Sequence, residues 1–310
     1  MLRIHFLNVG HGDCIIVEFI DNGRTAIIDI NRTSEMDSNS ANELAESFSI
    51  STEAMYSTAS IIAALESAGY DISLQDPIDY LNQKGISKIF RFISTHPHMD
   101  HLSGFNVLNK EFSVSNVWII KNSYTQDNSK LSASQKEDWR LYKKFRDTSE
   151  NKIDNTTIIR PEEGSEADYY TEDGITVLAP NEELKEAAKT NANEMSYILL
   201  IKHKGKKIIL GGDAEEATWE YLLENYSGEL KNIDILKAAH HGRDSGYYQP
   251  AVKHMSPTVT IVSVGKKPKT DASNKYRQYC DNVWSTRWKG NIVFEISDGG
   301  EITYTTQYDR

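Results

Sequence analysis

Residues 95–101 of this chain place three histidines and one aspartate directly after the apolar run at residues 88–94. The side chains concerned are His96, His98, Asp100 and His101. Imidazole and carboxylate groups are ligands of first-row metals, and a cluster this dense is costly to explain as solvated surface. The segment therefore predicts a strand that ends in a metal-binding loop.

Composition sets the class of protein. With 310 residues, 39% hydrophobic and 25% charged, the chain is typical of a globular protein with a large core. No apolar run approaches the ~20 residues that span a bilayer, and the amino-terminus shows a strand pattern and no signal peptide, so we expect no membrane association and a cytoplasmic location. The two cysteines, Cys14 and Cys280, are expected to be free thiols. A net charge of −11 disfavours nonspecific binding of long DNA.

Apolar runs between turn signals predict strands at both ends of the chain and helices between them. The expected strands lie at residues 1–9, 14–20, 25–30, 87–94, 115–120, 175–178, 196–203, 206–210, 233–238, 259–264, 292–296 and 301–305. The expected helices lie at residues 58–68, 77–84, 102–108, 132–145, 215–224 and 247–254. The first three strands are expected to form a meander, and the polar residues 31–57 a long loop.

Chemically active side chains recur at the ends of the expected strands. Asp29 ends the third strand, residues 95–101 follow a later one, and Asp213 follows another. His240 and His241 follow a fourth strand. In layered α/β proteins, rigid strands aim such side chains into loops at one edge of a sheet. Residues that are far apart in sequence are therefore expected to converge on one site.

The order of these segments resembles that of the metallo-β-lactamase-fold hydrolases, and within them the soluble hydrolase domain of ComEC-type competence proteins. The resemblance covers nearly the whole chain and is carried by residues 8–13, 26–29, 95–104, 193–196, 210–213 and 236–242. It implies an α/β fold, a four-layer αββα sandwich with a two-metal centre along one edge. We expect a single domain over residues 1–310 with loop and helical insertions at about 31–86 and 121–157.

The resemblance also implies a ligand set for two divalent ions, Zn²⁺ or Mn²⁺. It implies that the first metal is bound by His96 and His98 and the second by Asp100 and His101. Asp213 is implied as a ligand of both. The last ligand is His241 or His240, of which we favour His241 because it directly precedes a glycine. The first metal position is the less certain of the two.

Two segments depart from the family pattern. Many members supply a further histidine near residues 193–196, where this chain has Asn193 and Ser196. ComEC-like proteins also have Asn-x-x-Ser there, so the departure favours that subfamily while it opens the first metal site. At residues 266–274 a lysine-rich run replaces the His-Pro of relatives. Lys269 is expected either to grip phosphate or to lie in a basic surface loop.

Further residues are candidates for supporting roles. Asp29 is expected behind the ligands, where it would orient a loop or a histidine. Asp13 belongs to a Gly-His-Gly-Asp turn near the same edge, and Arg243 would line the substrate side. Structural interpretations stand beside these: the Gly-His-Gly-Asp segment as a plain turn, Asp213 as a helix N-cap, and His5, His203 and His254 as structural or exposed.

The favoured function is a metal-dependent hydrolase, above all a phosphodiesterase or nuclease that acts on nucleic acid or nucleotides through a metal-activated water. Asp100 is expected to orient that water. The acidic chain favours single strands, short oligonucleotides or nucleotides over long duplexes. The alternative is a carbonyl hydrolase of the lactamase, lactonase or thioesterase type. A non-catalytic binding module is disfavoured because the ligand set is nearly complete.

Overall fold

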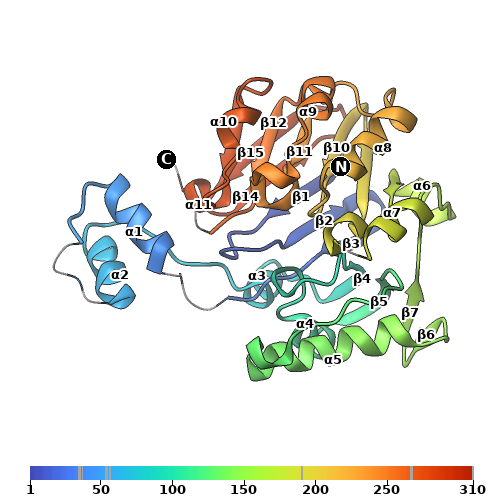
Figure 1. The fold of residues 1–310 in the computed structure, drawn as a ribbon, viewed down its shortest axis with the longest axis horizontal. Helices are drawn as coiled ribbons and strands as arrows, with labels where there is room; N and C mark the ends of the chain where they lie inside the picture. The colour runs from blue at the N-terminus through green and yellow to red at the C-terminus, as the bar shows by residue number, and fades with distance from the viewer. Residues whose placement is uncertain are drawn as a thin grey trace.

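The computed structural model describes all of residues 1–310 except 34–35, 37, 53–54, 56, 190, 266–267 and 309–310. Two mixed β-sheets lie face to face, and helices cover their outer faces (Figure 1). This arrangement confirms the predicted α/β fold class, a four-layer αββα sandwich.

The larger sheet begins with the predicted meander and continues with parallel strands. In spatial order its strands are β15 (Ile302–Thr306), β14 (Ile292–Ile296), β1 (Leu2–Phe6), β2 (Ile15–Phe19), β3 (Arg24–Ile28), β4 (Lys88–Ile93), β5 (Ser113–Trp118), β7 (Thr156–Ile159) and β6 (Lys152–Ile153). Strands β1, β2 and β3 pair antiparallel, whereas β3, β4 and β5 run parallel. The carboxyl ends of β3 and β4 therefore open at the same edge.

The smaller sheet has a parallel half as well. Its spatial order is β13 (Asn282–Ser285), β12 (Val259–Val262), β11 (Ile235–Lys237), β10 (Lys206–Leu210), β9 (Ile198–His203) and β8 (Ile175–Ala179). Strands β10 to β13 are parallel neighbours, and β8 and β9 are antiparallel to their neighbours. The loops that follow β10 and β11 thus leave from one edge of this sheet.

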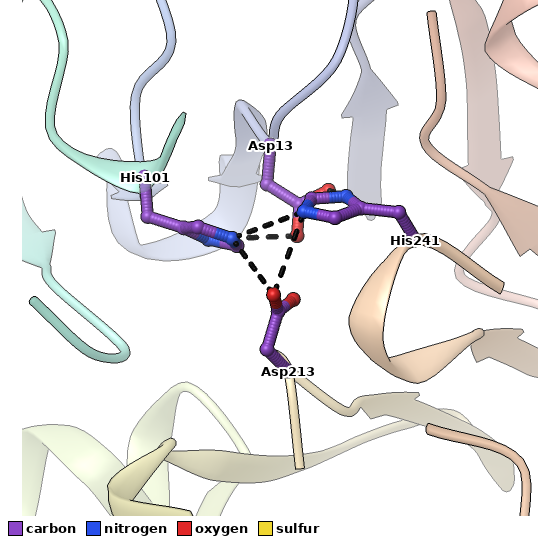
Figure 2. A group of neighbouring side chains, drawn as sticks. All are labelled: Asp13, His101, Asp213 and His241. Atoms are coloured by element: carbon purple, nitrogen blue, oxygen red, sulfur yellow. Dashed lines mark hydrogen bonds and ion pairs between the residues drawn. The ribbon is translucent and has the colours of Figure 1, made fainter. Parts of the chain in front are cut away.

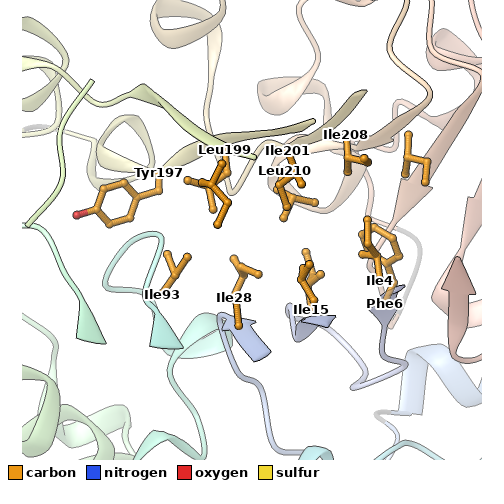
Figure 3. Packing of buried hydrophobic residues seen from close by; sticks show 14 of the residues in the cluster. Ile4, Phe6, Ile15, Ile28, Ile93, Tyr197, Leu199, Ile201, Ile208 and Leu210 are labelled. Carbon is orange, nitrogen blue, oxygen red and sulfur yellow. The ribbon is translucent and has the colours of Figure 1, made fainter. Parts of the chain in front are cut away.

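Apolar side chains from both sheets fill the space between them. Because side chains alternate along a strand, each strand sends every second residue inward. Figure 3 shows the two facing rows, with Ile4, Phe6, Ile15, Ile28 and Ile93 on the larger sheet and Leu199, Ile201, Ile208 and Leu210 on the smaller. All are at most 2% exposed, so the two sheets form one rigid support for the loops at their edge.

Helices pack on the outer faces of both sheets and leave two further apolar layers. Those that cover the larger sheet are α3 (Pro77–Gln83), α4 (Phe105–Glu111) and α5 (Ala133–Asp147). Those that cover the smaller sheet are α7 (Glu182–Ala187), α8 (Glu216–Tyr226), α9 (Gln249–Met255) and α10 (Ser273–Tyr276). Two short helices, α6 (Asp168–Glu172) and α11 (Thr286–Lys289), do not belong to these outer layers, and Tyr170 of α6 packs in the cluster between the sheets.

Helices α1 (Ser38–Ser47) and α2 (Thr58–Ser67) form a small layer of their own, which projects to one side of the sandwich (Figure 1). The prediction of a long loop over residues 31–57 is wrong for α1. Ala41, Leu44 and Ala45 follow helical spacing and give this polar segment a buried stripe, which packs in one cluster with α2. The domain count and the two insertions stay predictions.

Several short elements escaped the sequence patterns, namely β6, β7, β13, α6, α7, α10 and α11. The helix expected at residues 102–108 begins later, at Phe105. Cys14 and Cys280 are buried free thiols, as predicted. Across the described part of the chain, every helix is too short or too polar to span a bilayer.

Candidate metal centre

Loops from both sheets bring the predicted ligands together at one edge of the sandwich. Residues 95–101 follow β4, Asp213 follows β10, and His241 follows β11. Figure 2 shows His101, Asp213 and His241 turned toward one another, with Asp13 beside them. The expectation that strand-end residues converge on one site therefore holds for these loops.

Asp213 lies at the centre of the group. Its Oδ2 atom is 3.3 Å from His101 Nε2, 3.5 Å from His241 Nε2 and 3.7 Å from His96 Nε2. All four side chains are buried, and three imidazoles present the same ring nitrogen to one carboxylate oxygen. Such an arrangement is typical of ligands that surround a shared cation.

Asp100 and His98 extend the group toward solvent, since both side chains are only partly buried. Asp100 Oδ2 lies 3.3 Å from His241 Nε2, and His98 Nδ1 lies 3.0 Å from His96 Nε2. The cluster thus has a buried half around Asp213 and a more accessible half on this side.

The structure separates the two adjacent histidines. His241 points inward and its side chain is 1% exposed, whereas that of His240 is 16% exposed with Nε2 3.9 Å from Asp213. His240 Nδ1 is 2.7 Å from Ser245 Oγ and 3.0 Å from Glu215 Oε1, so neighbours already engage it. This geometry favours His241 as the ligand.

The backbone that separates these histidines is strained. His240 has a φ of 49° and His241 a φ of 54°, both in the left-handed region that side chains other than glycine rarely adopt. Each such residue costs about 1–3 kcal/mol and persists where surrounding structure enforces it, often at functional sites. In this backbone conformation His241 points into the site, and His240 lies at its more exposed rim.

Charges in the cluster shift its pKa values in opposite directions. Burial alone would lower the pKa of His101, but Asp213, Asp29 and Asp100 outweigh it and raise that pKa well above its ordinary value. Burial would raise the pKa of Asp213, yet His241 and His101 hold it well below its usual range. In the metal-free protein, protons on histidines therefore offset the gathered carboxylates.

Asp29 lies behind the ligands, where the sequence placed it. Its Oδ2 is 2.7 Å from His101 Nδ1 and accepts a hydrogen bond from Thr95 Oγ1 at 2.6 Å. Its Oδ1 accepts another from the Thr95 backbone N–H at 2.7 Å. Asp29 thus ties the β4 loop to the ring of His101 and directs Nε2 toward Asp213.

Asp13 lies 3.7 Å from His101 Nδ1 and 3.8 Å from His241 Nδ1, and it is paired with a residue that the sequence patterns did not indicate. Lys237, fully buried at the end of β11, forms an ion pair with Asp13 and donates to the carbonyl oxygen of Gly212 at 3.1 Å. Its Nζ is also 3.8 Å from Asp213 Oδ1. The available signal was a lysine within an otherwise apolar strand, because buried lysines require a partner.

His11, from the same Gly-His-Gly-Asp loop, is a second missed residue. Its ring centroid is 4.7 Å from that of His241, and it groups with Asp100 and His241. Burial and the charge of His241 lower the pKa of His11 to about 4. Gly12 is required in this loop, since a Cβ there would lie 2.4 Å from the carbonyl oxygen of Asp100.

The remaining candidates lie further out. Ser196 Oγ accepts a hydrogen bond from the Asp213 backbone N–H at 3.1 Å, so it positions that loop. Asn193 Nδ2 instead donates to Glu215 Oε1 at 2.9 Å. Arg243 Nη2 lies 3.0 Å from His11 Nε2, on the side of the cluster formed by the Gly-His-Gly-Asp loop. Lys269 is exposed, and no contact joins it to the cluster among the described residues.

Of the purely structural roles considered for these residues, the one for Asp213 is wrong and the one for His5 is confirmed. Helix α8 begins at Glu216 with Glu215 in the cap position, so Asp213 is not its N-cap. His5 is buried and bonded to Tyr80 and Glu18, which makes it structural as predicted.

The residues present fit a divalent cation. Asp213 Oδ1 is buried and has no hydrogen-bond partner among the described residues. One ligand atom each from Asp13, His101, Asp213 and His241 lies within 4.8 Å of the others. A set of imidazole nitrogens and carboxylate oxygens suits Zn²⁺ or Mn²⁺.

No protein-family model matches the chain, and no curated protein matches it. Similar solved structures include Igni18, a metallo hydrolase from Ignicoccus hospitalis, with 14% identity, a TM-score of 0.49 and coverage of 97% of this chain and 98% of that one. A diphosphatase of the PhnP family has 11% identity, a TM-score of 0.41 and coverage of 92% and 95%. A putative metal-dependent hydrolase from Parabacteroides distasonis has 11% identity, a TM-score of 0.42 and coverage of 91% and 92%. Similarities this distant do not indicate the activity of this protein.

Proposed function

We propose that this protein is a metal-dependent hydrolase with a two-metal centre, and that its substrates are phosphodiesters of nucleic acid or nucleotides. The observation that carries the proposal is the convergence of three histidine Nε2 atoms on one oxygen of buried Asp213. The other oxygen is buried without a hydrogen-bond partner among the described residues, with Lys237 Nζ 3.8 Å away, and this supports a role as a metal ligand.

Divalent ions in such a centre polarise a phosphoryl oxygen and lower the pKa of a water toward ~7. In the proposed ligand set His96, His98 and Asp213 would hold one ion, and Asp100, His101, His241 and Asp213 would hold the other. In many of the hydrolases that the sequence resembles, a further histidine comes from the region of Asn193, so we expect the first position to be the more open one.

Asp100 would orient the attacking water. Burial would raise the pKa of Asp100, but His101 and His241 lower it well below its usual range, so its carboxylate stays ionised at neutral pH. Its side chain is 32% exposed and accessible from solvent. A carboxylate there can accept a hydrogen bond from the attacking water and hold one of its lone pairs toward the phosphorus.

The proposed substrate class is supported by the open side of the cluster and by its charge. A phosphodiester carries a negative charge, which two divalent ions would offset, whereas the carboxylates alone would repel it. With a net charge of −11, the chain suits single strands or nucleotides better than long duplexes.

Two buried free cysteines fit the reducing environment of the proposed cytoplasmic location.

The experiment is a substrate panel on metal-free protein supplied with Mn²⁺ or Zn²⁺. The panel contains bis-p-nitrophenyl phosphate, labelled single- and double-stranded DNA and RNA, and nitrocefin. We expect phosphodiester turnover that requires metal and is lost in Asp213→Asn. The matched control Asp154→Asn changes an aspartate that is 87% exposed and should keep wild-type turnover. Turnover of nitrocefin alone would select the carbonyl-hydrolase alternative and overturn the proposal.

A further inference from the structure

A cavity of about 620 Å³ lies against the accessible side of the candidate metal centre. His98, whose ring is 4.8 Å from that of His96, forms part of its wall. The rest of the wall comes from residues 120–125 after β5 and from residues of α7 and the short 3₁₀ helix Ala192–Met195. A molecule in this cavity would therefore touch one of the proposed ligands.

The walls suit a flat, partly apolar group. Ile120, Ala188, Ala192 and Met195 supply an apolar surface. The half-buried ring of Tyr124 meets His98 edge to face, with centroids 5.2 Å apart, and both rings line the cavity. Pockets of this size and lining bind small molecules by stacking and burial.

The amide side chains of the wall are already engaged. Asn122 Nδ2 donates to the Ile120 carbonyl at 2.9 Å and to the Tyr142 hydroxyl at 2.8 Å. Asn191 Nδ2 donates to Glu215 at 2.7 Å, and its Oδ1 accepts from the Asn193 backbone N–H at 3.2 Å. Because these amides are already hydrogen-bonded within the protein, they are poorly placed to recognise the hydrogen-bonding groups of one particular ligand.

Cationic side chains lie at the same cavity. Lys185 pairs with Glu162 and Glu182, and Lys189 pairs with Glu186. Lys121 is exposed and has no ion pair among the described residues. It is therefore the ammonium group best able to meet an anionic ligand.

We propose that this cavity holds the nucleoside part of a nucleoside phosphodiester while the phosphoryl group lies at the candidate metal centre. This inference rests on the proposed function and specifies its substrate. Tyr124 and the apolar wall bind the base by stacking, and the ammonium group of Lys121 at the cavity attracts the anionic ligand. Because every base has a stacking face and the wall amides are engaged, the cavity does not discriminate among bases.

The test is calorimetric binding of thymidine 5′-monophosphate to the metal-loaded full chain, which requires no turnover. Tyr124→Ala should raise the dissociation constant about tenfold, in the range that loss of one base-stacking contact produces. Tyr124→Phe keeps the ring and should bind as the wild type does. Lys121→Glu should weaken binding severalfold at low salt, whereas Lys253→Glu, an exposed residue of α9 outside the cavity, should not.

The four common nucleoside 5′-monophosphates should bind with similar affinity, and each more tightly than inorganic phosphate. Unchanged binding in both Tyr124→Ala and Lys121→Glu, or inorganic phosphate that binds as tightly as the nucleotides, would overturn the inference. Nucleotide binding with this pattern but without phosphodiester turnover would contradict the proposed function and leave the cavity assignment in place.

Discussion

Asp29 Oδ2 lies 2.7 Å from Nδ1 of His101, and both side chains are buried. The contact engages one nitrogen of the imidazole and leaves Nε2 directed at Asp213, 3.3 Å away. Partners of this kind fix the tautomer and orientation of a metal-binding histidine. Asp29 keeps this position although its φ of 57° lies in the left-handed region, which aspartate and asparagine tolerate better than most residues.

Asp29→Asn tests this support. Asparagine tolerates the same backbone and still accepts a hydrogen bond from Thr95, but it lacks the charge that faces His101. We expect metal affinity to fall about 10–100-fold, as for other residues that orient metal ligands. Competition titration with a chelator measures it. Asp79→Asn, at an exposed position of α3, serves as the control, and equal affinities of the two variants would refute the role of Asp29.

Lys237→Met tests the buried ion pair with Asp13. Methionine preserves most of the volume but leaves Asp13 and Asp213 without their cation. Removal of one partner from a buried pair costs about 3–5 kcal/mol in the free energy of unfolding, which urea denaturation measures on metal-free protein. The double variant Lys237→Met/Asp13→Asn should recover part of this loss, because no uncompensated charge then remains at position 13. A single variant as stable as the wild type would show that the pair is unimportant.

The raised pKa of His101 predicts how stability depends on pH. Burial opposes this shift, and the charge of Asp213 is the largest of those that produce it. A folded-state pKa above the unfolded value of about 6.5 stabilises the metal-free protein fully below that pH. The stabilisation is lost as pH rises through the folded pKa. We therefore expect the melting temperature of metal-free protein to fall on the alkaline side.

Metal should reverse this trend, because it binds deprotonated histidine and its affinity rises with pH. The increase in melting temperature caused by Zn²⁺ should thus grow between about pH 6.5 and the raised pKa. Thermal unfolding with and without Zn²⁺ across this range measures it. A Zn²⁺ effect that shrinks as pH rises would contradict the assignment of His101.

The two adjacent histidines predict opposite outcomes. His241→Ala should lose bound metal, since His241 Nε2 contacts both Asp100 and Asp213. His240→Ala should keep it, because Ser245 and Glu215 already engage that ring. Elemental analysis of the purified variants decides between them. Retention of full metal content by His241→Ala would assign the ligand role elsewhere.

Much of the fold followed from local sequence. Strands such as β4 and β10 were predictable because their buried residues form short apolar runs that end at turn signals. Helix α1 was not, because its serine and asparagine content indicates a loop and Leu44 is buried by tertiary packing in one cluster with α2. Tertiary packing overrode local propensity there.

The candidate site divides in the same way. Its proposed ligands stand in short motifs, so their proximity could be expected from strand order. The pair of Lys237 with Asp13 joins residues 224 positions apart and depends on how the two sheets meet. The inward turn of His241 depends on left-handed backbone, and the cavity at Tyr124 on how the loop after β5 packs near α7 and the 3₁₀ helix Ala192–Met195. None of these follows from one-dimensional pattern.

We propose above all that this protein hydrolyses phosphodiesters at a metal centre in which Asp213 is the shared ligand. The most direct measurement is the hydrolysis of bis-p-nitrophenyl phosphate by metal-free protein during titration with Mn²⁺, together with the amount of metal bound. We expect no turnover without metal, turnover that saturates near two bound ions per chain, and neither tight binding nor turnover in Asp213→Asn. Turnover that persists without metal, or wild-type binding and turnover in Asp213→Asn, would contradict it.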